Sequence, residues 1–350
     1  MDEDELISIK NIFSYTVSKI NSGMKYLGFY LKPYRYLLKD WDWLIAKAEK
    51  RIMHWSHRWL SRGGKLVLIK SVLEALPVFW MHFWIPVGII EKIRKLCFKF
   101  LWSCGDGSSS GMPWISWKVL ASPKSLGGWV LKVPALFAKA LAAKSVWNVI
   151  HGSGLWVQIV LQKYIWPLSL LDWIRERDKK KSGISICWKS VLWSFHLIGD
   201  FLVWKIGNGD NVCIGLDPWA GCKWRHGLPS HLIEYLHSAG YYFLKDDGTL
   251  PVSYLMEQGW LSSIDLGLVE NADIIAWNGY LAILKSNHIR FRIEDDTLVW
   301  NQAKNGEYSP RCGYLHLFLE QHEREIEWWW NMFWHMKCPL KSKIFVWSLF

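Results

Sequence analysis

The sequence predicts an α+β protein that is mainly α-helical, with a helical N-terminal half and a mixed α/β C-terminal half. Three observations support this fold class. Apolar residues recur every three or four positions through much of residues 39–101, which is the period of one helix face. The alanine-rich stretch 135–147 has high helix propensity. After about residue 181, Asn-Gly and Gly-Asp turns separate short apolar runs, which favours short strands.

The first helix is expected at residues 39–60, where apolar and basic side chains each follow the helical period. Asp40 and Asp42 lie near its N-terminal end, where the helix dipole favours carboxylates. Its apolar face comprises Trp41, Leu44, Ala48, Ile52, Trp55 and Trp59. Its basic residues are Lys47, Lys50, Arg51, His54 and Arg58.

Two glycines, Gly63 and Gly64, are expected just past this helix, because glycine adopts the left-handed conformation that ends a helix without a Cβ clash. A second helix is expected from Lys65 to about Leu76. It stops at Pro77, which cannot continue the backbone hydrogen bonds. The first two helices therefore form a helix-turn-helix joint.

A third helix is expected after Pro86, because proline suits the first turn of a helix. Its apolar face comprises Ile90, Ile93, Cys97, Phe100 and Leu101. Lys92, Lys95 and Lys99 form a second, basic stripe along the same helix.

Downstream of these helices the pattern changes several times. Residues 103–111 have the composition of a flexible loop, and residues 135–166 are expected to be helical again. Residues 175–183, RERDKKKSG, have the composition of a solvated linker. The run FLVWKIGNGD at 201–210 is expected to enter a hairpin, because Asn-Gly favours tight turns between strands.

The composition indicates an intracellular protein, nuclear or cytoplasmic, without a transmembrane segment. The chain has 350 residues, of which 51% are hydrophobic, and its 27 tryptophans are expected to be mostly buried or half-buried. Its seven cysteines form no CxxC pair, which favours a reducing compartment. Residues 1–10 lack an apolar signal core, and the longest apolar run, 77–90, is shorter than the roughly 20 residues of a membrane helix.

The positive charge is concentrated in one part of the chain. The formal net charge is +11, and the segment Lys32–Trp102 carries 14 Lys or Arg against 5 Asp or Glu, 14 − 5 = +9. Rows of cations at helical spacing can follow an RNA or DNA backbone weakly and without reading bases. The candidate nucleic-acid-binding residues are Lys47, Lys50, Arg51, Arg58, Arg62, Lys65, Lys92, Lys95 and Lys99. The alternative is a protein-interaction or anionic-membrane-surface module, since basic, tryptophan-rich helices also suit lipid headgroups.

Two motifs that would indicate other chemistry are incomplete. The stretch 59–73 looks like a Walker phosphate loop, but Trp59 and Leu66 occupy the places of its leading glycine and its metal-binding hydroxyl. Residues 107–111, GSSSG, match a nucleophile elbow without the required strand before it and helix after it. We therefore predict neither a nucleotide site nor another small-molecule substrate.

Candidate metal ligands are also present without the expected context. Two Asp-Asp pairs, at 244–248 and 293–297, carry Leu244 and Ile293 where a polymerase hairpin has an aromatic residue, so a turn or helix cap is favoured. The set Cys213, Cys222, His226 and His231 has the right residue types for zinc, but its first spacing is too long. We expect no catalytic residue, metal or cofactor.

Eight segments stand out in a fixed order along the chain. They are KYLGFYL (25–31), WLSRGGKLVLIKSVLEALPVFWM (59–81), FLWSC (100–104), ISWKVLASPKSLGGWV (115–130), ALFAKALAAKSVW (135–147), VWKIGNGDNVCIGLDPW (203–219), DDTLVWNQAKNGEYSPRCGY (295–314) and WWWNMFWHMKCPLKSKIFVWSLF (328–350). Together they resemble the region downstream of the palm in reverse transcriptases of plant LINE-type (non-LTR) retroelements. The segment 203–219 is the most specific match, and the resemblance runs from about residue 24 to 350.

The resemblance implies five segments along the chain. They are the palm end (1–30), a thumb-like helical domain (31–105), a helical connection and linker (106–180), a mixed connection region (181–296) and a truncated reverse-transcriptase zinc-binding domain (297–350).

This chain departs from the family pattern at its functional centres. The family's catalytic aspartates lie upstream of the segment around Tyr26, and its zinc ligands follow the FVW segment at 345–347. Ala138 replaces the usual Asn, and Trp129 interrupts the usual Gly-Leu-Gly. We therefore expect a catalytically incomplete fragment of such a polyprotein, which retains at most non-specific RNA or DNA binding. The sequence leaves its oligomeric state open.

Overall fold

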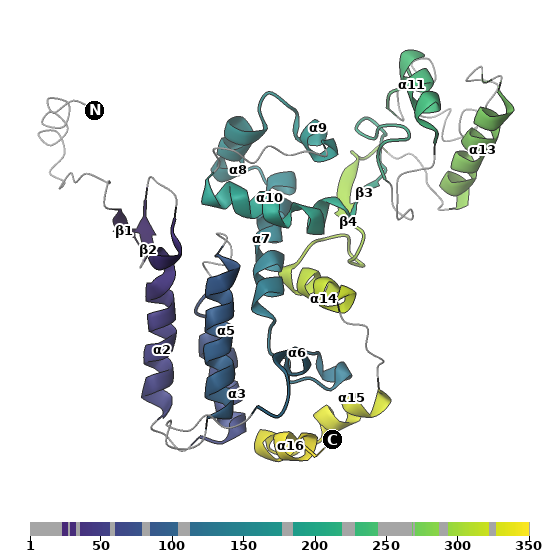
Figure 1. The fold of residues 1–350 in the computed structure, drawn as a ribbon. Helices are drawn as coiled ribbons and strands as arrows, with labels where there is room; N and C mark the ends of the chain where they lie inside the picture. The colour runs from purple at the N-terminus through teal and green to yellow at the C-terminus, as the bar shows by residue number, and fades with distance from the viewer. Residues whose placement is uncertain are drawn as a thin grey trace, which may run out of the picture. The chain divides into compact units, whose positions relative to one another are not determined.

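The computed structural model describes residues 23–26, 29–32, 36–56, 60–78, 85–103, 113–176, 185–218, 228–243, 268, 270–286, 293–321 and 327–349. These residues form helices and two small antiparallel sheets, which confirms the mainly α-helical α+β class (Figure 1). The chain divides into two compact units. Unit 1 comprises Met1–Phe79, Ile85–Ala135 and Glu327–Phe350, and unit 2 comprises Trp80–Trp84 and Leu136–Ile326.

Unit 1 is built around a group of packed helices. A short hairpin precedes them, and its strands carry the KYLGFYL segment. Helix α2 packs against α5, and α3 packs against both α5 and the C-terminal helix α16. The elements are β1 (Met24–Tyr26), β2 (Phe29–Leu31), η2 (Leu38–Trp41), α2 (Asp42–Ser56), α3 (Arg62–Leu68), η3 (Ile69–Leu73), α5 (Val87–Trp102), α6 (Trp117–Leu120), η4 (Lys124–Leu126), α15 (Trp328–His335) and α16 (Leu340–Trp347).

The apolar faces predicted for the first and third helices form the core of this unit. Burial of these side chains away from water is the main favourable term that holds the helices together. The shared core includes Trp41, Leu44, Ala48, Leu66, Ile69, Leu73, Ile90, Ile93, Cys97, Phe100 and Leu101. The period of three and four residues therefore predicted correctly which side of α2 and α5 is buried.

The glycine pair between the first two helices was assigned to the wrong place. Helix α3 begins at Arg62, so Gly63 and Gly64 lie in its first turn and do not follow the end of α2. The Ser61 hydroxyl caps this turn by accepting a hydrogen bond from the Gly64 amide at 3.3 Å. Capping by serine and the contact of α16 with Gly63 together outweigh the low helix propensity of glycine.

The last part of the chain is shared between the two units. Helices α15 and α16 belong to unit 1, where the Trp347 ring lies edge-on to Trp129 at a centroid distance of 4.9 Å. The Trp347 indole donates a hydrogen bond to the Gly127 carbonyl. Residues 297–326 belong to unit 2. The division between the units thus falls between Ile326 and Glu327, within the predicted segment 297–350, whose assignment stays a prediction.

Unit 2 contains a long helix, several shorter helices and one strand pair. The predicted helical stretch 135–166 is confirmed, with a break at residues 152–154. The elements are α7 (Pro134–His151), α8 (Leu155–Val160), η5 (Leu161–Ile165), α9 (Leu170–Arg175), α10 (Ile186–Gly199), β3 (Leu202–Lys205), α11 (Ser230–Ser238), α13 (Asn271–Ser286), β4 (Thr297–Trp300) and α14 (Pro310–Glu320). The first two residues of α7 belong to unit 1.

Strand β3 does not form the local hairpin that its Asn-Gly turn suggested. It pairs antiparallel with β4, with Leu202 opposite Trp300 and Lys205 opposite Thr297. Trp300 is fully buried, and its indole donates a hydrogen bond to the Leu197 carbonyl at 3.0 Å. Pairing with the distant strand β4 is favoured over a local hairpin because it brings the large Trp300 side chain into the core.

A second apolar cluster in unit 2 joins β3 to α11 and α13. Helices α11 and α13 both contribute side chains to this cluster, although they are well separated in the sequence. Its buried members are Trp204, Ile206, Val212, Ile214, Leu228, Leu232, Leu236, Trp277, Tyr280 and Leu281. Many tryptophans are thus core residues, as expected. Within the described part of the chain, none of the helices combines the length and apolar character that crossing a bilayer demands.

Candidate nucleic-acid interface

The basic residues of α2 lie on its solvent side. Lys47, Lys50 and Arg51 are all exposed, whereas Leu44 and Ala48 of the same helix are almost completely buried. The three cations are one turn or less apart, so their side chains can reach along one strip of the helix surface. Their exposure follows from the apolar positions that bury the other side of the helix.

Helix α5 carries a second row of exposed cations. Lys92, Lys95 and Lys99 are exposed and recur at intervals of three and four residues. The intervening positions Ile93 and Cys97 are buried. This stripe therefore faces away from the core of unit 1, as the sequence predicted.

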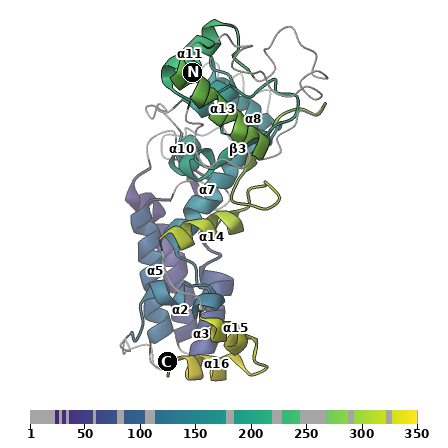
Figure 2. The ribbon, with the colours of Figure 1, turned by 90° about the vertical axis from the view of Figure 1, so that its right-hand side faces the viewer.

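The two helices lie side by side within unit 1, as both views show (Figures 1 and 2). Near their C-terminal ends, the Trp55 and Phe100 rings are 5.8 Å apart. We refer to the exposed cations on the two helices as the basic surface of unit 1. It comprises Lys47, Lys50, Arg51, Lys92, Lys95 and Lys99.

Acidic residues offset part of this charge. Glu49 is an exposed carboxylate on α2, while Glu91 of α5 forms an ion pair with Arg94 at 2.6 Å. Glu91 and Arg94 are three residues apart on the same helix, so the charge of Glu91 is paired with Arg94 and not with the lysine stripe. The basic surface therefore keeps a net positive charge, which attracts polyanions and is screened by salt.

The remaining predicted cations have different environments. Lys65 is only 7% exposed, and its ammonium donates hydrogen bonds to the Ser103 carbonyl at 2.7 Å and hydroxyl at 2.9 Å. It therefore does not belong to the basic surface, because its charge is directed to the C-terminal end of α5. Arg62 is half-buried against two tryptophan rings. Arg58 lies outside the described residues.

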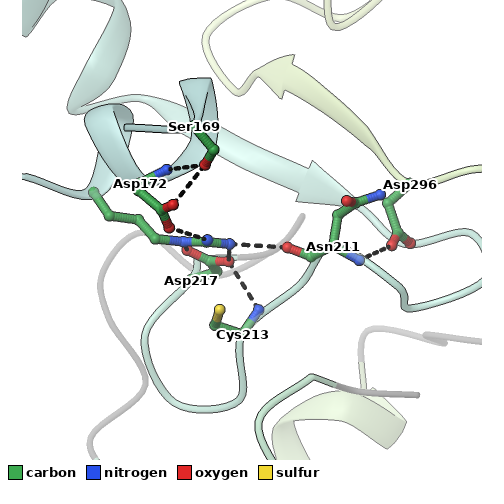
Figure 3. Close-up of polar contacts among 7 residues, drawn as sticks. Ser169, Asp172, Asn211, Cys213, Asp217 and Asp296 are labelled. Atoms are coloured by element: carbon green, nitrogen blue, oxygen red, sulfur yellow. Dashed lines mark hydrogen bonds and ion pairs between the residues drawn. The ribbon is translucent and has the colours of Figure 1, made fainter. Parts of the chain in front are cut away.

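A buried carboxylate explains the second Asp-Asp pair. Asp296 accepts hydrogen bonds at Oδ1 from the amides of Gly207 at 2.7 Å and Gly209 at 3.0 Å. Its Oδ2 accepts one from the Asn211 amide at 2.9 Å (Figure 3). Its neighbour Asp295 is exposed. Both Asp296 oxygens thus hold the GNGDN loop in place. The expectation of a solvated turn or helix cap is wrong for Asp296, because this side chain is buried and directly precedes β4.

The same loop is held at its other end by Arg175. The Arg175 guanidinium donates to Asp217 through Nε at 3.0 Å and Nη2 at 2.6 Å, and to the Asn211 carbonyl at 2.9 Å. Asp217 also accepts from the Cys213 amide at 2.9 Å (Figure 3). The prediction that Arg175 belongs to a solvated linker is wrong, because this residue ends α9 and binds a buried carboxylate.

The zinc candidate is described only in part. Cys213 is buried, and His231 Nε2 lies within hydrogen-bond distance of Asp273 Oδ1, at 2.9 Å. Cys222 and His226 lie outside the described residues, as do the Asp-Asp pair at 246–247 and the GSSSG segment. In the portions that are described, no three His, Cys, Asp or Glu side chains come together in a way that could hold a metal ion.

Comparisons with known proteins identify two plant relatives. The chain is 22% identical over 319 residues, 87% of its length, to a protein of Arabidopsis thaliana named "Putative ribonuclease H protein". The match spans 47% of that protein, so the chain corresponds to about half of its length. It is also 25% identical over 147 residues to an "Uncharacterized mitochondrial protein" of the same plant, covering 41% of this chain and 92% of the relative. No protein-family model matches the chain.

Proposed function

We propose that the chain is part of a protein encoded by a non-LTR retroelement, and that it holds an RNA or DNA backbone on the basic surface of unit 1. The observation that carries this proposal is the pair of exposed cationic stripes on two packed helices. Each phosphate that a lysine or arginine neutralises releases condensed counterions, which favours binding. The cations would contact phosphates and leave the bases unread, so binding would be sequence-independent.

Two lines of support favour a retroelement origin. The sequence segments that resemble non-LTR reverse transcriptases occur in the family's order over nearly the whole chain. The first relative, which matches 87% of the chain, is named "Putative ribonuclease H protein", a name that refers to RNA. A backbone-binding role for this chain is consistent with that name.

We further propose that this chain does not itself catalyse polymerisation. Asp296, which belongs to one of the two Asp-Asp pairs, uses both carboxylate oxygens to hold a loop. An assay of primer extension with the purified chain, magnesium and all four nucleotides should give no product. Templated incorporation would contradict the non-catalytic part of the proposal and leave backbone binding standing.

Charge reversal tests the backbone-binding proposal. Fluorescence anisotropy would measure the affinity of a labelled oligonucleotide for the wild-type chain and two triple variants. The first variant reverses the α5 stripe with Lys92→Glu, Lys95→Glu and Lys99→Glu. The control reverses three exposed lysines elsewhere in unit 1, with Lys118→Glu, Lys337→Glu and Lys341→Glu. Both variants change the net charge equally, so a difference between them reports the position of the charges.

The α5 variant should lose binding by tenfold or more at low salt, because each lost contact also becomes a repulsion, whereas the control should lose far less. Equal losses would show that only the net charge matters and would reject the proposed surface. Binding to vesicles of anionic lipid that an oligonucleotide does not displace would assign the surface to membranes instead.

A further inference from the structure

A row of aromatic rings in unit 1 runs from the core to an exposed tryptophan. Trp117 lies edge-on to Phe98 at 6.1 Å, Phe98 edge-on to Trp102 at 6.4 Å, and Trp102 lies 6.1 Å from Trp114. Trp117 and Trp102 are each 6% exposed, but Trp114 is 60% exposed. The row therefore ends in a ring that packs against buried aromatic residues and is itself exposed to solvent.

Arg62 fixes the exposed ring in position. Its guanidinium carbon lies 4.1 Å from the Trp114 ring centroid and 5.0 Å from that of Trp102. A guanidinium over an aromatic face is held by the ring quadrupole and by stacking of the two planar groups. Arg62 thus occupies one face of Trp114, and the high exposure of the indole leaves apolar ring surface open to a ligand.

Cations accompany this open ring. Lys99 of the basic surface precedes Trp102 by three residues on α5, so the two side chains are neighbours on the helix. Trp102 in turn contacts Trp114 and Arg62. An aromatic face beside cations matches a chain of bases joined by phosphates better than it matches an apolar peptide.

We propose that Trp114 stacks on an unpaired base of single-stranded RNA or DNA, with Arg62 bracing the ring and contacting the adjoining phosphate. This inference rests on the proposed function and adds the substrate class, a single strand or a strand end. Stacking on an aromatic side chain requires a free base face, which a continuous duplex does not offer. Every base has such a face, so the contact adds affinity without sequence specificity.

The test compares single-stranded and duplex oligonucleotides of equal length and sequence. Trp114→Ala should weaken binding of the single strand by between about fivefold and a hundredfold, and should change duplex binding by less than twofold. Trp114→Phe should recover most of the lost single-strand affinity, because it keeps an aromatic face. Trp328→Ala, which removes another exposed tryptophan of unit 1, should leave both affinities unchanged.

A second readout separates stacking from a general effect on folding. A base stacked on Trp114 should quench part of the tryptophan fluorescence of the wild-type chain, and the quench should be smaller in a Trp114→Ala variant with unchanged circular dichroism. If Trp114→Ala binds the single strand as tightly as wild type, the stacking inference is wrong while the basic surface stands. If the wild-type chain binds neither oligonucleotide, the proposed function itself fails.

Discussion

Arg175 and Asp217 form a two-point ion pair that joins the end of α9 to the loop after β3, with donor–acceptor distances of 3.0 and 2.6 Å. The residues are 42 positions apart in the sequence. The Asp217 side chain is 6% exposed and that of Arg175 is 21% exposed, so water competes little for the pair. A planar guanidinium presents two parallel N–H donors that match the two carboxylate oxygens, whereas an ammonium is a compact point charge without this fork geometry.

Replacing Arg175 with lysine should therefore destabilise unit 2 by about 2 kcal/mol, because at least one charged hydrogen bond to Asp217 is lost. Urea unfolding followed by circular dichroism would measure the change. Arg311→Lys is the matched control, since Arg311 is exposed on α14 of the same unit. Equal stability of Arg175→Lys and wild type would show that the fork geometry contributes little.

Stability should also depend on both oxygens of the Asp296 carboxylate. Asp296→Asn replaces one acceptor oxygen by an NH₂ group, which leaves at least one of the amides of Gly207, Gly209 and Asn211 without its acceptor. We expect a loss of about 2 to 3 kcal/mol in the free energy of unfolding. The same change at the neighbouring exposed Asp295 should cost less than about 0.5 kcal/mol. Similar losses at both positions would refute the anchoring role.

Val130 has a backbone φ of 57°, in the left-handed region that β-branched residues avoid. Its side chain is 44% exposed, so little apolar burial would be lost on substitution. Val130→Asn should stabilise the protein by about 1 kcal/mol, because asparagine tolerates this conformation. Val67→Asn, at an exposed position in α3, should give no gain in thermal midpoint. A lower midpoint for Val130→Asn would contradict the strain argument.

Burial raises the pKa of Glu74 above its ordinary value of 4.5, although the hydrogen bond from the Lys132 amide and the charges of Lys132 and Lys70 oppose this shift. When a carboxyl group has a higher pKa in the folded state, the folded protein loses stability as the pH rises above the unfolded pKa. The reason is that the group ionises more readily in the unfolded chain. Glu74→Gln keeps the acceptor for Lys132 at 2.7 Å and removes this penalty.

The Glu74→Gln variant should therefore be more stable than wild type at pH 7.5, and the difference should shrink as the pH falls to 4, below the ordinary pKa of 4.5, because Glu74 is then mostly protonated in both states. Urea midpoints at the two pH values would show this, with Glu49→Gln as an exposed control. If Glu74→Gln is less stable at pH 7.5, attraction between Glu74 and Lys70 outweighs the cost of burial.

Local periodicity was enough to predict α2, α5 and the exposure of their cations. Burial of Leu44 and Ala48 in α2, and of Ile93 and Cys97 in α5, fixes which face of each helix points to the core. The lysines on the opposite face must then be exposed to solvent. These features depend on residues three and four apart, so a single sequence contains the information. The long helix α7 was predicted from a different local signal, the high helix propensity of its alanine-rich stretch.

Features that depend on distant partners were not predicted. The pairing of Lys205 with Thr297 and the ion pair of Arg175 bring together segments that no local pattern links. Lys65 has the spacing of a surface cation, but the end of α5 supplies its hydrogen-bond acceptors at Ser103. The contact of Trp114 with Arg62 likewise joins the segment before α6 to the start of α3, which are far apart in the sequence. Such contacts are set by tertiary structure, which overrides local preference.

The salt dependence of duplex binding tests the central claim most directly. The logarithm of the association constant should fall linearly with the logarithm of salt concentration, with a slope of about −0.9 for each neutralised phosphate. Neutralising the stripe with Lys92→Gln, Lys95→Gln and Lys99→Gln should make the slope shallower by about 2.7, if each lysine meets one phosphate. Lys118→Gln, Lys337→Gln and Lys341→Gln should leave the slope unchanged. Equal slopes for the wild type and the α5 variant would contradict the account.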